Sequence, residues 1–308
     1  MVYSIENCGK SNQSQSIWAY LQLMRPANIT TAWADILMGY AAVVTVVVGN
    51  NPNFTALGWL ILATTGLYGG GVIFNDVCDA KLDAVERPER PIPSGRASLS
   101  GAIALGTVWL IIGVLAAAMV SAVSAMLAIA IAIAALIYDK WGKHQTFLGP
   151  VNMGMCRGGN LLLGISAVSG AVSDRWYLAL IPIVYIAAIT AISQGEVHGG
   201  KKITGVIAIA LLITVIGSVV SLNVLSSYSF FIALPFLSLF TALVLPPFIR
   251  AAIDPSPQLI QTAVKAGVLS LIVLDAAIAA GFNGWIYGSL LLALLPLSRF
   301  LARMFAVT

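Results

Sequence analysis

Three aspartates at the end of a long apolar run are the residues of this chain best suited to chemistry. Asp76, Asp79 and Asp83 stand at positions i, i+3 and i+7, so on a helix their carboxylates share one face. They fall at the carboxyl end of the expected helix, where the helix macrodipole already repels negative charge. A hard divalent cation such as Mg²⁺, which usually brings a phosphate group with it, would stabilise this arrangement.

A solvated acidic helix end is the alternative interpretation of this cluster. The chain contains only 12 Asp and Glu residues, and five of them lie between positions 76 and 89. Because the few acidic residues are concentrated in this way, we favour a cation-binding site over an ordinary polar helix end.

The composition predicts that membrane-spanning helices carry this cluster. Hydrophobic residues make up 59% of the 308 residues and charged residues only 9%, and the mean hydropathy is +0.94. A soluble protein would carry roughly 25% charged residues. Spanning about 30 Å of hydrocarbon takes about 20 apolar residues, and the apolar runs here have that length. The sequence therefore predicts an all-α, polytopic integral membrane protein whose partner is the lipid bilayer.

The apolar runs predict nine or ten transmembrane helices in one domain. Residues 1–20 lack the basic start and cleavage site of a signal peptide and predict a short flexible tail, so residues 21–308 form the domain. The two counts differ only in the last apolar run, which forms either a tenth transmembrane helix or a half-helix after nine. The expected helices are 28–48, 56–79, 99–119, 122–138, 149–169, 176–196, 203–222, 229–249, 259–280 and 285–305.

The placement of basic residues predicts the orientation. Of the 16 Lys and Arg residues, 14 lie in the amino-terminal tail, near the connections after even-numbered helices or at the end of the last helix. Arg175 lies in a connection on the other side, and Arg157 lies within a helix. The positive-inside rule then places both termini and the aspartate cluster in the cytoplasm. The net charge of +4 reflects this topology and does not require a nucleic-acid partner.

Other functional motifs are weak or missing from the sequence. The three cysteines form no spaced pair, and the two histidines have no partner at the spacing of a zinc site. The sequence contains neither a Walker loop nor a nucleophile elbow. Gly69-Gly70-Gly71 could be mistaken for a phosphate loop, but glycines inside a membrane helix more often allow close helix packing.

A second acidic helix end echoes the first. Glu196 closes the expected helix 176–196, and a basic connection follows it, as one follows Asp76 and Asp79. If the two halves of the chain pack with pseudo-symmetry, Glu196 faces these aspartates across a central cavity. Two acidic walls with basic residues above them suit a diphosphate bridged by metal ions. Coincidence is the alternative.

At these residues the chain resembles the UbiA superfamily of intramembrane prenyltransferases. The segment Asn75-Asp76-x-x-Asp79-x-x-x-Asp83 matches the first aspartate motif of that family, at the end of its second helix. The segment from Arg87 to Gly95 resembles the arginine-rich loop of the family. Weaker likenesses lie at Arg25-Pro26-Ala27-Asn28, at Tyr138 with Lys140, and at Arg157-Gly158-Gly159.

The resemblance implies a UbiA-like bundle around a central cavity that opens sideways into the bilayer. In that family an allylic prenyl diphosphate bound to Mg²⁺ ionises, and a lipophilic, usually aromatic acceptor captures the prenyl cation. By this resemblance Asp76, Asp79 and Asp83 bind one Mg²⁺, and Asn75 orients the diphosphate. The charge that develops on the leaving diphosphate would be stabilised by the metal and by basic side chains, which are Lys81, Arg87, Arg90 and Lys140.

The end of the sixth expected helix departs from the family. The second motif of the family offers two or more aspartates, whereas this chain has only the carboxylate of Glu196 there. Glu196 could contact a second Mg²⁺ and serve catalysis, with Lys201 helping to hold the diphosphate, while His198 is a poor Mg²⁺ ligand. A reduced second site fits an altered donor or acceptor, or an isoprenoid binder without turnover. A divergent protein of a bacterial plasma membrane, encoded in a gene cluster for a secondary metabolite, would fit this departure.

Three charged residues fall within expected spans, where each costs roughly 3 kcal/mol at the bilayer centre. Arg157 could line the site near the diphosphate or neutralise an acid on a neighbouring helix, and both interpretations stay open. For Asp35 and Asp275 we favour structural pairing.

Two classes of function follow. The favoured one is Mg²⁺-dependent transfer of a prenyl group from an allylic (poly)prenyl diphosphate to an aromatic or other lipophilic acceptor. The alternative is a non-catalytic component on the same fold that binds or transports an isoprenoid or secondary metabolite. A proton-coupled transporter could use Asp35, Asp275 and Glu196 to relay protons. That function would not explain why Asp76, Asp79 and Asp83 lie beside basic residues.

Overall fold

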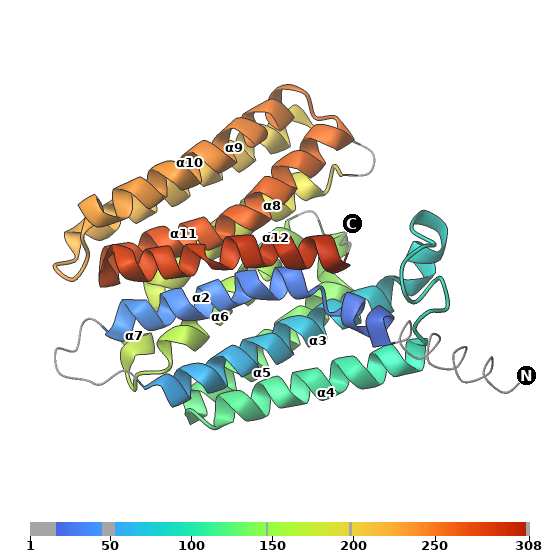
Figure 1. Ribbon diagram of the computed structural model, residues 1–308. Helices are drawn as coiled ribbons and strands as arrows, with labels where there is room; N and C mark the ends of the chain where they lie inside the picture. Colours follow the sequence, from blue (N-terminus) through green and yellow to red (C-terminus); the bar gives the residue numbers. More distant parts are fainter. Residues whose placement is uncertain (1–16, 45–52, 146, 197–198, 306–308) are drawn as a thin grey trace, which may run out of the picture.

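The described residues form a bundle of helices without a strand (Figure 1). The computed structural model describes residues 17–44, 53–145, 147–196 and 199–305. After a short helix at residues 17–23, the α-helices are α2 (Pro26–Val44), α3 (Phe54–Glu86), α4 (Leu99–Ala118), α5 (Ala122–Lys140), α6 (Leu148–Ile165), α7 (Ala171–Arg175), α8 (Leu180–Ser193), α9 (Lys202–Ser221), α10 (Phe230–Ile253), α11 (Pro257–Leu292) and α12 (Leu294–Phe305). Seven helical stretches in the described part of the chain are long and apolar enough to cross a membrane. The protein is an integral membrane protein, as its composition predicts.

Polar side chains start several of these helices. The side chain of Asn53 accepts a hydrogen bond from the backbone N–H of Ala56 at the start of α3. Ser98 and Ser121 accept equivalent bonds at the starts of α4 and α5. Such caps satisfy backbone donors that have no partner within the helix, so each apolar run begins at a defined residue.

Three expected helix boundaries differ from the structure in ways that affect the site. The expected helix 176–196 ends earlier, because α8 stops at Ser193 and Glu196 lies in the turn that follows it. Helix α3 continues to Glu86 rather than ending near residue 79, so all three aspartates lie inside it. The expected last two helices, 259–280 and 285–305, appear as α11 with a kink at Gly284, followed by α12. Gly284 has φ 83° and ψ 168°, a conformation that a residue with a side chain rarely adopts. Of the expected tail, residues 1–16 lie outside the described part of the chain.

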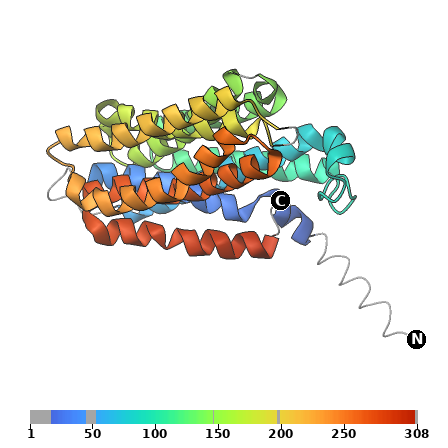
Figure 2. The same cartoon turned by 90° about the horizontal axis from the view of Figure 1, so that it is seen from above.

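The helices pack in two groups on either side of α2 and α6 (Figure 1). On one side α3 packs along α4 and α5, and on the other α11 packs along α10 and α8. Helix α2 contacts members of both groups and also α12, and most of its residues are buried. Figure 2 shows that the segment after α3 projects at the end of the bundle where α2 begins. This arrangement brings the ends of α3, α5 and α8 to the same region of the protein.

Glycines allow the close contact between α3 and α4. A Cβ atom at Gly66 would lie 2.5 Å from the carbonyl oxygen of Trp109 and 2.7 Å from the backbone nitrogen of Gly113. Gly70, the middle residue of the glycine run, meets the backbone of Gly106 in the same way, at 2.9 Å. The run therefore lies inside a helix and serves helix packing, and it does not form a phosphate loop.

We expect Gly66→Ala to destabilise the fold, because the added methyl group must push α4 away from α3. Overpacking of this kind costs about 1–3 kcal/mol. The matched control is Gly58→Ala on the same helix, where a Cβ would meet no atom within 4 Å. Thermal unfolding in detergent, followed by size-exclusion chromatography, should show a lower midpoint for Gly66→Ala only. Equal midpoints for the two variants would contradict the close contact.

Candidate active site

A cavity of about 380 Å³ opens between the two groups of helices. Its volume is within the range of small-molecule binding sites. Most of its wall is apolar, and side chains from α3, α5, α6, α8 and α11 contribute to it. Its polar lining residues are Arg25, Thr64, Tyr68, Asn75, Tyr138, Asp139, Arg157, Asn160, Thr190, Ser193 and Glu196. The cavity can therefore hold an apolar molecule that carries a charged group.

Arg25 binds the first aspartate of the α3 motif. Its Nη2 donates to Asp76 Oδ1 at 2.6 Å, and Arg25 is also one of the residues that line the cavity. Its φ of 48° is the only positive φ of a non-glycine residue in the described part of the chain. Such a backbone conformation is uncommon and often marks a functional position. The turn that enters α2 thus directs a positive charge at the aspartate cluster.

Arg90 joins the first and third aspartates from the other direction. Its Nη1 donates to Asp83 Oδ2 at 2.7 Å and approaches Asp76 Oδ1 at 3.4 Å. Arg90 belongs to the arginine-rich segment after α3, which folds back on itself through hydrogen bonds such as Ser94 N–H to the Arg90 carbonyl at 3.0 Å. Arg90 therefore holds this loop against α3.

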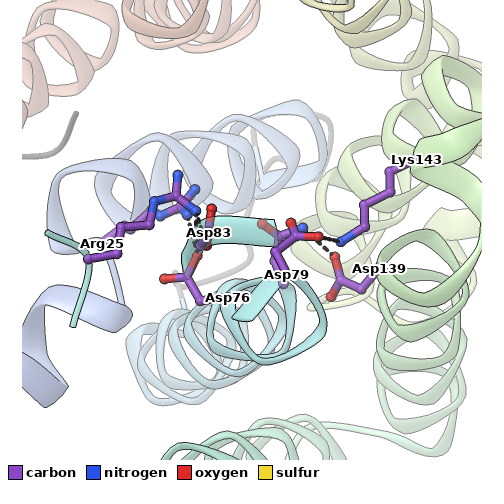
Figure 3. Close-up of polar contacts among 8 residues, drawn as sticks. Arg25, Asp76, Asp79, Asp83, Asp139 and Lys143 are labelled. Carbon is purple, nitrogen blue, oxygen red and sulfur yellow. Dashed lines mark hydrogen bonds and ion pairs between the residues drawn. The ribbon is translucent and has the colours of Figure 1, made fainter. Parts of the chain in front are cut away.

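The second aspartate faces a different set of partners (Figure 3). Asp79 pairs with Lys143, which lies in the turn after α5. Beside them Asp139, near the end of α5, accepts a hydrogen bond from Asn75 Nδ2 at 2.9 Å through its Oδ1. The other oxygen of Asp139 is buried and has no hydrogen-bond partner. The acidic motif is thus divided between two clusters, one around Arg25 and Arg90 and one around Lys143.

Glu196 lines the same cavity as Asn75 and Asp139. Burial raises the pKa of Glu196, while the positive charges of Arg87 and Lys265 lower it and only partly offset the burial. Arg87 therefore lies close enough to attract Glu196 across the region between α3 and α8. The neighbouring residues 197–198, which include His198, lie outside the described residues.

Arg157 neutralises an acid on a neighbouring helix and also lines the cavity, whereas its contact with a diphosphate stays a prediction. Its Nη1 donates to Asp35 Oδ2 at 2.9 Å, and a second contact reaches Thr31. Asn160 Nδ2 also donates to Asp35 Oδ2 at 2.9 Å. Arg157 lines the cavity as well, 5.4 Å from the ring centre of Tyr68. It is therefore a structural partner of a buried acid and a part of the cavity wall.

Asp275 on α11 faces this buried group. Its carboxyl is within hydrogen-bonding reach of Asp35, and both residues are almost fully buried. Asp35 and Asp275 thus join α2 and α11 around Arg157 of α6, which agrees with the structural pairing that we favoured for them.

Some of the expected site residues lie in or beside the cavity wall, and others are exposed away from it. Asn75, Arg157 and Glu196 line the cavity, and Asp76, Asp79, Asp83 and Arg90 lie in ion pairs beside it. The side chains of Lys81, Lys140 and Lys201 are exposed and lie outside the cavity wall. Their expected contacts with a diphosphate stay predictions.

Three residues that sequence reasoning did not assign to the site are part of it. Arg25 was noted only for its resemblance to the segment entering the first helix, and Asp139 and Lys143 were given no role. Asp139 had a recognisable signal, because a carboxylate directly after a long apolar run is costly unless it serves a site. Lys143, rather than Lys140, reaches Asp79 because a 3₁₀ turn at Gly142–His144 follows α5.

The oxygen donors beside the cavity suit Mg²⁺ that is shared with a phosphate group. The described residues hold no group of three or more His, Cys, Asp or Glu side chains that could bind a metal ion by themselves. At phosphate sites, however, Mg²⁺ uses one or two carboxylates and completes its shell with phosphate oxygens and water. Asp79 and Asn75 offer such oxygens, and the unpartnered Oδ2 of Asp139 adds another.

Comparison with known proteins gives one consistent family. A family model described as the UbiA prenyltransferase family matches residues 36–264. Digeranylgeranylglyceryl phosphate synthase of Saccharolobus solfataricus is 30% identical over 182 residues, which are 58% of this chain and 61% of that protein. The enzyme of the same name from Methanosarcina barkeri is 28% identical over 161 residues, which are 50% of this chain and 56% of that protein. The matched region thus spans less than two thirds of these relatives.

Solved structures show the same fold. A structure described as digeranylgeranylglyceryl phosphate synthase in membranes has a TM-score of 0.66 at 18% identity and covers 86% of this chain and 98% of its own. The apo structure of a UbiA homologue from Aeropyrum pernix has a TM-score of 0.61 at 16% identity and covers 80% of this chain and 96% of its own. The expected UbiA-like bundle is confirmed.

Proposed function

This chain belongs to the UbiA prenyltransferase family, and we propose that it transfers a prenyl group from an allylic prenyl diphosphate to a lipophilic acceptor in the membrane. One observation carries this proposal. An apolar cavity of about 380 Å³ has Asn75, Arg25 and Glu196 in its wall, beside the paired carboxylates of α3. Apolar walls suit a prenyl chain, and the polar residues suit a diphosphate with its cation.

In this proposal the residues beside the cavity bind and polarise the diphosphate. Asp76 and Asp79 would hold Mg²⁺, which neutralises negative charge on the leaving group when it is bound. Arg25 lies in the cavity wall and would donate to phosphate oxygens. Arg90 and Lys143, which pair with the aspartates of α3, would do the same. Charges of this kind, placed before the reaction, stabilise the anion that develops as the bond breaks.

The apolar part of the wall would protect the reacting prenyl group. Water that reached it would compete with the acceptor, so a wall of aliphatic side chains favours transfer over hydrolysis. The aliphatic lining residues include Leu67, Ile131, Ile186, Val268 and Leu271.

The acceptor is lipophilic in this proposal, and two classes can be compared. The resemblance to the family favours an aromatic acceptor, whereas the names of the relatives refer to the synthesis of digeranylgeranylglyceryl phosphate. The exposed hydrophobic side chains around the bundle support an acceptor of either class that reaches the site from the bilayer.

The test is release of diphosphate by purified protein in detergent. The protein is given Mg²⁺ and allylic diphosphates of one to four isoprene units, with phenolic acceptors in one series and glyceryl phosphate lipids in the other. We expect release that requires Mg²⁺ and one of the acceptors. Tight Mg²⁺-dependent donor binding without release would instead favour the non-catalytic binder, and no binding of any donor would contradict both.

We also propose that the site opens on the cytoplasmic side, because 14 of the 16 basic residues lie on that side of the expected topology. In a cysteine-free background, a membrane-impermeant thiol reagent added to intact cells should label Ser173→Cys, beside Arg175. It should not label Ser98→Cys at the start of α4 until the cells are opened. Both positions are exposed. The opposite pattern would contradict this orientation. The bacterial plasma membrane stays a prediction, since the relatives reported above are archaeal.

A further inference from the structure

The side chain of Asp139 is an unexplained feature of the cavity wall. It is only 4% exposed and lies within two residues of the end of α5. Its Oδ1 accepts the hydrogen bond from Asn75, whereas its Oδ2 is buried without a partner. A buried carboxylate oxygen without a partner is costly, so its retention requires a reason.

The neighbours of Asp139 indicate which kind of ligand would satisfy this oxygen. Asn75 and Asp79 lie one turn apart on α3, and both can contribute hard oxygen atoms beside Asp139, which is hydrogen-bonded to Asn75. Figure 3 shows Asp79 next to Asp139. The basic residue Lys143 beside this group already pairs with Asp79. A cation that also contacts a phosphate would complete this group, because Mg²⁺ prefers oxygen ligands.

We propose that Asp139 is a metal-ligating carboxylate of the Mg²⁺–diphosphate site, together with Asp79 and Asn75. This inference rests on the proposed function and adds a residue outside the α3 motif to it. The proposal also accounts for the reduced acidic segment after α8, where Glu196 is the only carboxylate in the described residues. The acidic ligands are then concentrated on α3 and α5, with Glu196 facing them across the cavity.

An alternative role for Asp139 is to hold Asn75 in place through the hydrogen bond alone. Asp139→Asn separates the two roles, because an asparagine oxygen can still accept from Asn75 but is a weaker ligand for a hard cation. Asp174→Asn is the matched control, since Asp174 is exposed on α7 at the other end of the bundle. Asp79→Asn serves as the reference for loss of the site.

The experiment measures Mn²⁺ as a probe for the site, in detergent-purified full-length protein. Electron paramagnetic resonance quantifies bound Mn²⁺ in the presence of geranyl thiolodiphosphate, whose sulfur linkage resists ionisation. Changes to residues around metal ligands lower affinity by about 10–100-fold. We therefore expect Asp139→Asn to weaken Mn²⁺ binding by at least about tenfold, and Asp174→Asn to leave it unchanged.

A second measurement needs no variant. Fe²⁺ bound in place of Mg²⁺, with ascorbate and peroxide, cleaves the backbone near its ligands. Cleavage of the wild-type chain near residue 139 as well as near 75–79 is expected. The role of Asp139 alone would be overturned by the following set of results. The wild-type protein binds Mn²⁺, Asp79→Asn removes that binding, Asp139→Asn preserves it, and no cleavage occurs near residue 139. Wild-type protein that binds no Mn²⁺ with the diphosphate would overturn this inference and the proposed function together.

Discussion

Replacement of Asp79 by asparagine should lower prenyl-transfer turnover by about 100–1,000-fold while leaving the fold intact. Metal ions contribute several kcal/mol to the stabilisation of charge in a transition state, and about 1.4 kcal/mol corresponds to a tenfold change in rate. Asp79 and its ion-pair partner Lys143 both keep some exposure to solvent, and an asparagine oxygen can still accept a hydrogen bond from Lys143, so we expect the fold to tolerate the change. Asp76→Asn should have an effect of the same size, because Asp76 belongs to the same site.

The comparison with Glu196→Gln tests the two sides of the cavity separately. If the α3 side carries the cation, Glu196→Gln should reduce turnover but retain Mg²⁺-dependent donor binding, whereas Asp79→Asn should lose both. Diphosphate release and binding of a labelled donor measure the two effects. Asp174→Asn, far from the cavity, is the control for the loss of a single carboxylate. Donor binding by Asp76→Asn and Asp79→Asn at the wild-type affinity would mean that these aspartates serve ion pairs within the fold and do not bind the cation.

The helices could be predicted closely from the sequence because their signal is local. Apolar runs of about 20 residues are required to span a bilayer, so hydropathy locates them directly. The predicted helices differ from the structure at two places where hydropathy carries little information. The charged continuation of α3 to Glu86 is stabilised by Arg90, which binds back to Asp83. The kink in α11 depends on the backbone of one residue, Gly284.

The site could be predicted only in part, because its contacts join distant parts of the chain. Asp76 and Arg25 are 51 positions apart, and Asp79 and Lys143 are 64 positions apart. The spacing of aspartates within one helix identified the acidic component, but no local pattern shows which basic residues approach it. Lys140 and Lys143 are equally plausible partners in sequence, and only the turn after α5 selects Lys143.

The spacing of the aspartates indicated that they bind a cation, but it did not show which side chains each of them contacts. Residues i and i+7 lie almost in line on a helix, while i+3 is rotated to the side. In the structure Asp76 and Asp83 accordingly share Arg90, and Asp79 turns to Lys143. A single helix face thus serves two clusters, and the second cluster brings Asp139 into the site.

The largest effect on stability should come from Arg157→Met. Arg157 neutralises Asp35, whose side chain is completely buried, and only 8% of the Arg157 side chain is exposed. Removing one partner of a buried ion pair costs about 3–5 kcal/mol, because the remaining charge has neither water nor a counter-ion. The free energy of unfolding, measured by circular dichroism during titration with sodium dodecyl sulfate in mixed micelles, should fall by this amount.

The double variant Arg157→Met/Asp35→Asn then separates the two roles of Arg157. Asparagine at position 35 removes the unpaired charge and can still accept the hydrogen bond from Asn160, so most of the lost stability should return. If Arg157 also contacts the diphosphate from the cavity wall, the stabilised double variant will still bind the donor more weakly than Asp35→Asn alone. Equal donor binding by these two variants would limit Arg157 to structural pairing. A failure to recover stability would mean that Asp275, which faces Asp35, requires the arginine as well.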